Sequence, residues 1–205
     1  MTAGGAADGA ANVPHLGRIR DLASRYVPDA VPESEIRDPW QAATALVVAP
    51  GDLGAELVLI ERVHRDGDPW SGHMALPGGK REDADSDLAA TAARETREEV
   101  GIALDQPVGR LDDQVGRTSG GRVATYVFVL DERPAMTPHP GEVADALWVP
   151  LRRLFHPRSA VPFHHADVPE PFPGLDVGGR VVWGLTHRTL ESFAAVLGLA
   201  FPLPR

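Results

Sequence analysis

The chain has 205 residues with a net charge of −9 and no cysteine, and 24% of its residues are charged. The negative charge disfavours broad binding to nucleic acids or anionic membranes, and the lack of cysteine excludes disulfides, thiolate catalysis and cysteine-based zinc sites. No apolar run reaches the length of a membrane span. Because residues 1–14 lack the charged start and apolar core of a signal peptide, we expect a cytoplasmic location.

The first 39 residues are predicted to precede the main domain. Residues 1–14 are rich in glycine and alanine, and we expect them to form a disordered leader. Residues 15–39 are expected to begin with a short helix over 15–27 and to continue as a connector punctuated by prolines. Residues 40–200 then form one domain, which is long enough to bury a substantial core.

Strands and helices are interspersed through residues 40–200. Apolar runs bounded by turn residues predict strands at 41–49, 55–63, 72–76, 106–117, 122–131, 147–149 and 181–183. Helical periodicity predicts helices at 87–100, 150–154 and 186–197. The stretch 156–180, rich in proline, histidine and glycine, carries no predicted element, and one interpretation is a loop that covers the substrate. This mixture predicts an α/β fold, an α/β/α sandwich with a mixed sheet.

Three glutamates stand close together in the predicted helix 87–100. Glu95, Glu98 and Glu99 are spaced i, i+3 and i+4, so a helix places their carboxylates on one side. Like charges at these spacings repel by about 0.2–0.5 kcal/mol per pair, and Gly101 marks the C-terminal end of the helix, where the dipole disfavours acids. A hard cation such as Mg²⁺ or Mn²⁺ would relieve the repulsion and would bridge to phosphate groups. The alternative interpretation is a solvated acidic helix face.

The stretch from Arg94 to Ile102, RETREEVGI, resembles the Nudix box, the metal-binding helix of hydrolases that cut nucleoside diphosphates linked to another group. The resemblance implies that Glu98 and Glu99 are the main metal ligands, that Glu95 adjoins them and that the carbonyl of Gly79 completes the site. It also implies that Arg94 is structural and pairs with an acid at the start of the box. In this family, a glutamate close before a late strand often serves as a further ligand or as the general base, and Glu142 occupies that place. A solvated loop acid is the alternative for Glu142.

The spacing inside the box departs from the family's common pattern. Five residues follow Gly79 and lead to Asp85, where a glutamate is usual, and eight residues then separate Asp85 from Arg94, one more than usual. We therefore expect Asp85 to be the partner of Arg94, with Glu82 and Asp83 as alternatives. The aspartate and the extra residue resemble the coenzyme A diphosphatase branch of the Nudix family, as do the segments around 61–80 and 182–186. Leu76, however, stands where that branch has an aromatic residue.

Several further side chains are candidates for contact with substrate. Arg62 and Arg65 can clamp a phosphate through their guanidinium groups, or can form surface ion pairs instead. Trp70 can stack on a nucleobase or simply pack, and His73 can touch substrate or make a structural hydrogen bond. Lys80 is the basic residue that follows a predicted turn at Pro77-Gly78-Gly79, the glycine turn. The neighbouring His164 and His165 point in different directions and are a weak metal-site candidate.

Together these features predict an Mg²⁺- or Mn²⁺-dependent hydrolase of a diphosphate linkage. The substrate expected first is coenzyme A or an acyl-coenzyme A, which would give 3′,5′-ADP and the phosphopantetheine part. ADP-ribose, NADH and nucleoside triphosphates are the alternative substrates, and a non-catalytic ligand-binding regulator is the alternative class. We expect a small-molecule partner and no nucleic acid or membrane. Dimers are common in the family, but the sequence shows no interface.

Overall fold

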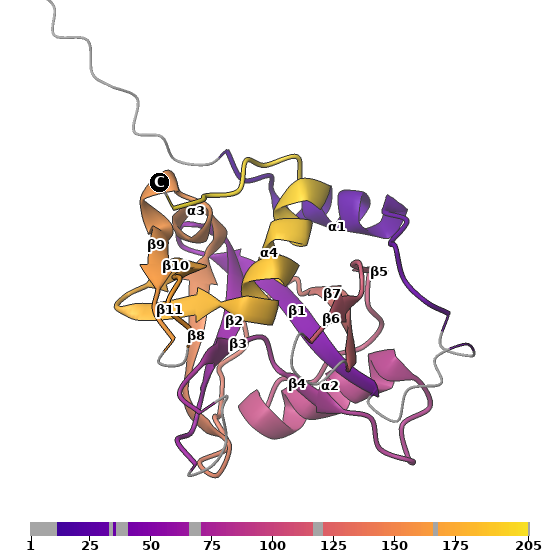
Figure 1. The fold of residues 1–205 in the computed structure, drawn as a ribbon. Coiled ribbons are helices and arrows are strands. Elements are labelled where there is room, and N and C mark those ends of the chain that lie inside the picture. The colour runs from indigo at the N-terminus through magenta and orange to yellow at the C-terminus, as the bar shows by residue number, and fades with distance from the viewer. Residues whose placement is uncertain are drawn as a thin grey trace, which may run out of the picture.

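The computed structural model describes residues 12–32, 35, 41–65, 71–116, 121–165 and 168–204. A main sheet of short and long strands is flanked by helices (Figure 1). Its strands are β1 (Gln41–Gly51), β2 (Gly54–Arg62), β3 (Met74–Ala75), β4 (Gly78–Lys80), β5 (Gly109–Arg110), β6 (Gln114–Val115), β7 (Arg122–Val129) and β8 (Val143–Pro150). The helices are α1 (Leu16–Arg25), α2 (Leu88–Val100), α3 (Leu151–Leu154) and α4 (Gly184–Val196). The helix predicted over 15–27 and the strands predicted over 41–49 and 55–63 are therefore present.

The main sheet is mixed, as predicted. Strand β1 pairs in parallel with β7 and antiparallel with β2, and β8 pairs with the opposite edge of β2. Strand β4 pairs antiparallel with the start of β1, where Ala43 opposes Gly79 and Thr44 opposes Gly78. This pairing places the glycine turn beside the central strand of the sheet.

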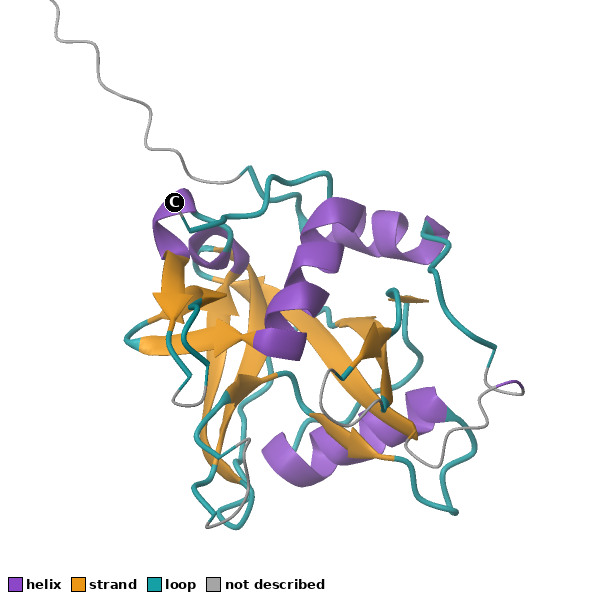
Figure 2. Cartoon of the chain, viewed as in Figure 1, coloured by secondary structure: helices purple, strands orange, loops and turns teal. Residues whose placement is uncertain are grey.

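Side chains that alternate along β1 build two apolar cores, one on each face of the sheet. Leu46 and Val48 face a core that includes residues of α1 and α4, whereas Ala45 and Val47 face α2. The small side chains on the second face let α2 pack closely against the strands. Figure 2 shows α2 on one side of the sheet and α1 and α4 on the other, which is the predicted α/β/α sandwich.

Several predictions of secondary structure were wrong in detail. The glycine turn is partly strand β4, the strand predicted over 72–76 is limited to β3, and helix α4 begins at Gly184 rather than at 186. The strand predicted over 106–117 is replaced by two short strands within 106–116, because β5 and β6 each pair separately with β7. Strand β8 begins at Val143, four residues before the predicted strand 147–149.

The stretch 156–180 also contains strands, where the sequence suggested only a loop. After a 3-10 turn at Pro157–Ser159, β9 (Ala160–Phe163) and β10 (Phe172–Val177) pair with each other, and β10 pairs with β11 (Arg180–Trp183) in a second, three-stranded sheet. Leu175 and Val182 from this small sheet are fully buried in the core that α4 covers. Within the described ranges, no helix combines the length and apolar character that a membrane crossing needs.

Candidate active site

Helix α2 begins and ends at clear capping residues. The carboxylate of Asp87 accepts a hydrogen bond from the backbone N–H of Ala90 at 2.7 Å and so caps the N-terminus. Gly101 ends the helix in the left-handed conformation, with φ of 74°, and its N–H bonds the carbonyl of Arg97. Glu95, Glu98 and Glu99 therefore lie in the last two turns, close to the C-terminal end, as predicted.

The glycine turn touches two of these glutamates directly. The backbone N–H of Gly78 donates to the carboxylate of Glu99 at 2.9 Å. At Gly79 the carboxylate of Glu95 lies so near that a Cβ atom would come within 2.4 Å of its Oε1. The absence of a side chain at Gly79 thus permits Glu95 to lie against the backbone of the turn.

Arg94 and Asp85 form a bidentate ion pair at the base of the site. Arg94 Nε lies 3.0 Å from Asp85 Oδ1, and Arg94 Nη2 lies 3.1 Å from Asp85 Oδ2. Asp85 is 8% exposed and also accepts from the backbone N–H of Glu82 and the hydroxyl of Thr91. The hydrogen bonds from Arg94 are the main cause that lowers the pKa of Asp85 to about 2. Glu82, the alternative partner, is more distant from Arg94, at 3.9 Å.

The same guanidinium also holds two glutamates of the helix. Arg94 Nη1 lies 3.1 Å from Glu95 Oε1 and 3.0 Å from Glu98 Oε2, and Arg94 Nη2 donates to the carbonyl of Lys80. Arg94 therefore ties the helix, the acid at the start of the box and the glycine turn into one unit.

Glu99 is the most deeply buried acid of the set. Its exposed fraction is 4%, and burial is the main cause that raises its pKa to about 8, assisted by the charges of Glu95 and Glu142. Burial likewise raises the pKa of Glu95, with Glu98 and Glu142 adding to the effect. Arg62 acts in the opposite direction on Glu99, because its positive charge favours the ionised form. The carboxylates thus repel one another at short range.

Glu142 reaches this cluster because its loop is fastened to α2. The backbone N–H groups of Thr137 and His139 donate to the carbonyls of Val100 and Glu99, at 2.8 and 2.9 Å. These bonds satisfy carbonyls at the end of the helix that have no partner within it. The carbonyl of Glu142 accepts from Val63 N–H at 3.0 Å, just beyond β2. The sequence signal for Glu142 was its place before β8, and the structure adds its proximity to Glu99.

The other predicted substrate contacts occupy different surroundings. Arg62 is half-buried and near Glu99, whereas the guanidinium of Arg65 donates to the carbonyl of Gly141, in the loop that carries Glu142. Lys80 is exposed, and Trp70 lies outside the described residues. The ring of His73 packs edge-on against Trp183, with centroids 4.9 Å apart.

An aromatic cluster that was not predicted from the sequence lies beside His73. Trp183 stacks on Phe163 with ring centroids 4.4 Å apart and planes 24° apart, and it also contacts His165 and Phe172. His165 therefore belongs to this cluster, and within the described ranges no three histidine or acidic residues already enclose a position for a metal ion. Phenylalanine and tryptophan are scarce in the chain, with six and four residues, so the aromatic residues at 163, 172 and 183 were the sequence feature that could have indicated this cluster.

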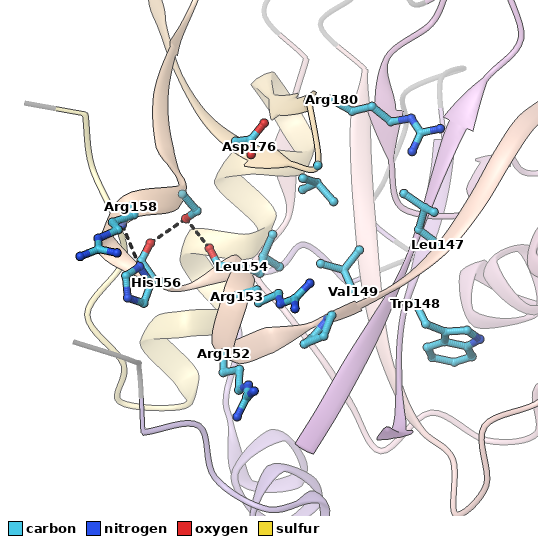
Figure 3. A pocket seen from close by; sticks show the side chains of 14 residues that line it. Leu147, Trp148, Val149, Arg152, Arg153, Leu154, His156, Arg158, Asp176 and Arg180 are labelled. Carbon is cyan, nitrogen blue, oxygen red and sulfur yellow. Dashed lines mark hydrogen bonds between the residues drawn. The ribbon is translucent and has the colours of Figure 1, made fainter. Parts of the chain in front are cut away.

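A cavity of about 750 Å³ lies at the other end of β8 from Glu142 (Figure 3). Its walls come from the end of β8, from α3 and from the β10–β11 turn, and four arginines line it: Arg152, Arg153, Arg158 and Arg180. In the close-up, Arg152 and Arg158 extend outward rather than toward a common point. Arg180 pairs instead with Glu61 at 2.8 Å and with Asp145 at 2.6 Å, which joins β11 to β2 and β8.

The sequence of the chain is similar to those of several known proteins. A protein of Schizosaccharomyces pombe described as uncharacterized is 35% identical over 161 residues, which are 66% of this chain and 48% of that protein. The peroxisomal coenzyme A diphosphatase NUDT7 of Mus musculus is 37% identical over 89 residues, which are 42% of this chain and 37% of NUDT7. The chain thus spans half or less of the length of these relatives.

A solved structure agrees in fold. The MutT/nudix family protein from Enterococcus faecalis superposes with a TM-score of 0.51 at 17% identity, over 82% of this chain and 70% of that one. The sequence model of the NUDIX domain matches residues 39–169, a range that holds the glycine turn, the acidic helix and Glu142. This chain therefore belongs to the Nudix family.

Proposed function

We propose that the protein is a divalent-metal-dependent hydrolase that cleaves a diphosphate linkage in a nucleoside-diphosphate derivative, with coenzyme A or an acyl-coenzyme A as the first candidate. The observation that carries the proposal is the group of carboxylates at the end of α2. Burial and the charges of Glu98 and Glu142 raise the pKa of Glu95, and burial and the charges of Glu95 and Glu142 raise the pKa of Glu99. Arg62 and Arg94 oppose this negative charge. A diphosphate-hydrolysing site needs such oxygen ligands, because Mg²⁺ and Mn²⁺ prefer them.

The residues present fit a divalent cation in kind. Glu95 lies against the backbone of Gly79, and the Gly79 carbonyl would add a further oxygen ligand. Glu98 and Glu99 add carboxylate oxygens from the same turn of α2. Arg94 also contacts Glu95 and Glu98, so a cation at these two carboxylates would compete with the guanidinium. The bound cation would neutralise the diphosphate and acidify a water molecule.

The chain's own groups would complete the reaction. Glu142 is fixed on the loop bonded to α2, where it can accept a proton from the attacking water. Arg62, half-buried beside Glu99, is placed to pair with a phosphate oxygen that approaches the cluster. Asp85 and Arg94 would hold the turn against the helix and would not contact substrate.

The test is a substrate panel with Mg²⁺ or Mn²⁺, with and without chelator, and with products resolved by mass. The panel contains coenzyme A, dephospho-coenzyme A, ADP-ribose, NADH and nucleoside triphosphates. We expect metal-dependent release of 3′,5′-ADP from coenzyme A to be the fastest cleavage, in line with the similarity to the coenzyme A diphosphatase NUDT7. Faster cleavage of another compound would refute the coenzyme A assignment and keep the reaction. No cleavage of any compound would favour a ligand-binding regulator, and Glu98→Gln serves as the inactive control.

A further inference from the structure

The small sheet β9–β10–β11 turns an aromatic face away from the protein core. Its other face is apolar and buried, because Leu175, Val177 and Val182 belong to the core beneath α4. Side chains alternate between the two faces of a strand, and residues paired across strands share a face. Trp183 pairs with Gly174, and Phe172 pairs with Phe163, so these aromatic rings lie on the face opposite the core.

The aromatic rings form a cluster that neither core absorbs. Phe163, Phe172 and Trp183 are all half-buried, and none of them is packed against either apolar core. The ring centroids of Phe163 and Phe172 lie 4.4 and 5.2 Å from that of Trp183. The ring centroids of His73 and His165 lie 4.9 and 5.5 Å from it. A strand face that meets solvent normally carries polar residues, so partly exposed aromatic rings in this position indicate a surface that binds another molecule.

The cluster connects to the carboxylates through a short series of contacts. The carbonyl of His73 accepts a hydrogen bond from the backbone N–H of Arg62 at 3.1 Å. Arg62 in turn places its charge near Glu99. Arg180 fastens the start of β11 to Glu61, the neighbour of Arg62 on β2, and to Asp145 on β8. A ligand whose phosphates meet Arg62 therefore has the aromatic face within its immediate surroundings.

We propose that the rings of Phe163 and Trp183, with His73 at their edge, bind the nucleobase of the substrate by stacking. This inference rests on the proposed function, which supplies a nucleoside-diphosphate compound. Stacking on an aromatic side chain contributes about 1–3 kcal/mol per base and does not depend on metal. A protein partner is the weaker occupant, since three aromatic side chains offer at most about 750 Å² and these three are partly buried, whereas a stable interface takes about 800 Å² from each side.

The probes that test the proposal are AMP and ribose 5-phosphate, which differ by the base alone. Binding is measured by calorimetry in the presence of chelator, so that neither metal nor hydrolysis is required. The wild-type protein should bind AMP more tightly than ribose 5-phosphate. Phe163→Leu, which keeps an apolar side chain without a π face, should weaken AMP binding about tenfold and leave ribose 5-phosphate binding unchanged. Phe163→Tyr should restore the affinity for AMP.

A matched control separates stacking from general damage. Trp148 lies on β8, donates to the carbonyl of Pro134 and packs against the core that α2 covers, so Trp148→Phe should leave AMP binding within twofold. For any compound that the enzyme cleaves, Phe163→Leu should raise KM about tenfold with little change in kcat, because stacking acts equally on bound substrate and transition state.

Three results would overturn the stacking proposal: equal affinity for the two probes, equal weakening of both by Phe163→Leu, or the same loss with Trp148→Phe. Hydrolysis is tested separately from binding. A protein that binds AMP through Phe163 but cleaves nothing would refute the proposed reaction alone. A protein that cleaves a diphosphate but binds both probes equally would refute the stacking alone.

Discussion

Replacing Asp85 with asparagine removes one charge from the ion pair at the base of the site and keeps the shape of the side chain. The Asp85 carboxylate is 8% exposed and accepts two hydrogen bonds from Arg94 and one each from Glu82 N–H and Thr91. Its pKa falls from 3.8 to about 2, chiefly because of the bonds from Arg94. At about 1.4 kcal/mol per pKa unit, the ionised form stabilises the folded protein by about 2 kcal/mol at neutral pH.

The expected loss for Asp85→Asn is therefore about 2–4 kcal/mol in the free energy of unfolding. The lower value is the charge effect alone, and the upper value approaches the cost of leaving one member of a buried pair without its partner. Urea denaturation at pH 7, followed by circular dichroism, measures this difference. Asp83→Asn is the control, because Asp83 is exposed, and it should change stability by less than about 0.5 kcal/mol.

The pH dependence gives a second test with a definite sign. A carboxyl whose pKa is lowered on folding contributes stability above its unfolded pKa, and that contribution is lost as the pH falls toward the folded value. The difference between wild type and Asp85→Asn should thus be constant above about pH 5 and should shrink from pH 4 toward pH 2. A variant as stable as wild type at pH 7, or a difference that does not change with acid, would refute the role assigned to the pair.

Three further predictions concern the site and the core. Glu99→Gln should lower kcat by orders of magnitude. In chelator, the wild-type protein should lose stability as the pH rises from 5 to 8, because a carboxyl pKa raised to about 8 means that ionisation of Glu99 destabilises the fold. Glu99→Gln should not show this loss, and a thermal melt of each protein checks it. Gly79→Ala should reduce activity but keep the fold, since the atoms nearest the new Cβ belong to the movable carboxylate of Glu95. Gly78→Ala should destabilise the fold, since its Cβ would lie 2.3 Å from a backbone carbonyl; activity and urea denaturation separate the two. Burial lowers the pKa of His187, so protonation of this residue should destabilise the wild-type protein below about pH 6.5. His187→Phe should lose less stability between pH 7.5 and pH 5, as measured by urea denaturation at both values.

The parts of the site that the sequence predicted well are those built from neighbours in the chain. Helix α2 has its cap at Asp87 and its end at Gly101, and both signals are local. Asp85 and Arg94 are nine positions apart, the first just before α2 and the second within it, so counting residues in the box was enough to suggest the pair.

The parts that the sequence did not reveal depend on contacts between distant segments. Strands β9 and β10 contain Pro162 and Pro173, which weaken the strand signal, and they are stabilised by pairing with each other. The bond from Arg65 to the carbonyl of Gly141 joins positions 76 apart and leaves no trace in the local pattern. His73 meets Trp183 across an even longer separation, so the aromatic face became visible only in the folded chain.

The loop at 137–142 explains why the acids at the end of α2 need a partner from outside the chain. Thr137 and His139 satisfy carbonyls at the end of the helix, but the same bonds bring Glu142 to a place already crowded by Glu99 and its neighbours. Arg94 divides its charge between Asp85 and two glutamates, and Arg62 offsets part of the negative charge around Glu99, so the acids outnumber the cations that these contacts supply. The fold thus brings more carboxylates than positively charged side chains to the end of α2. A divalent ion that binds the native state alone would stabilise it by about 2.7 kcal/mol at a hundred times its Kd.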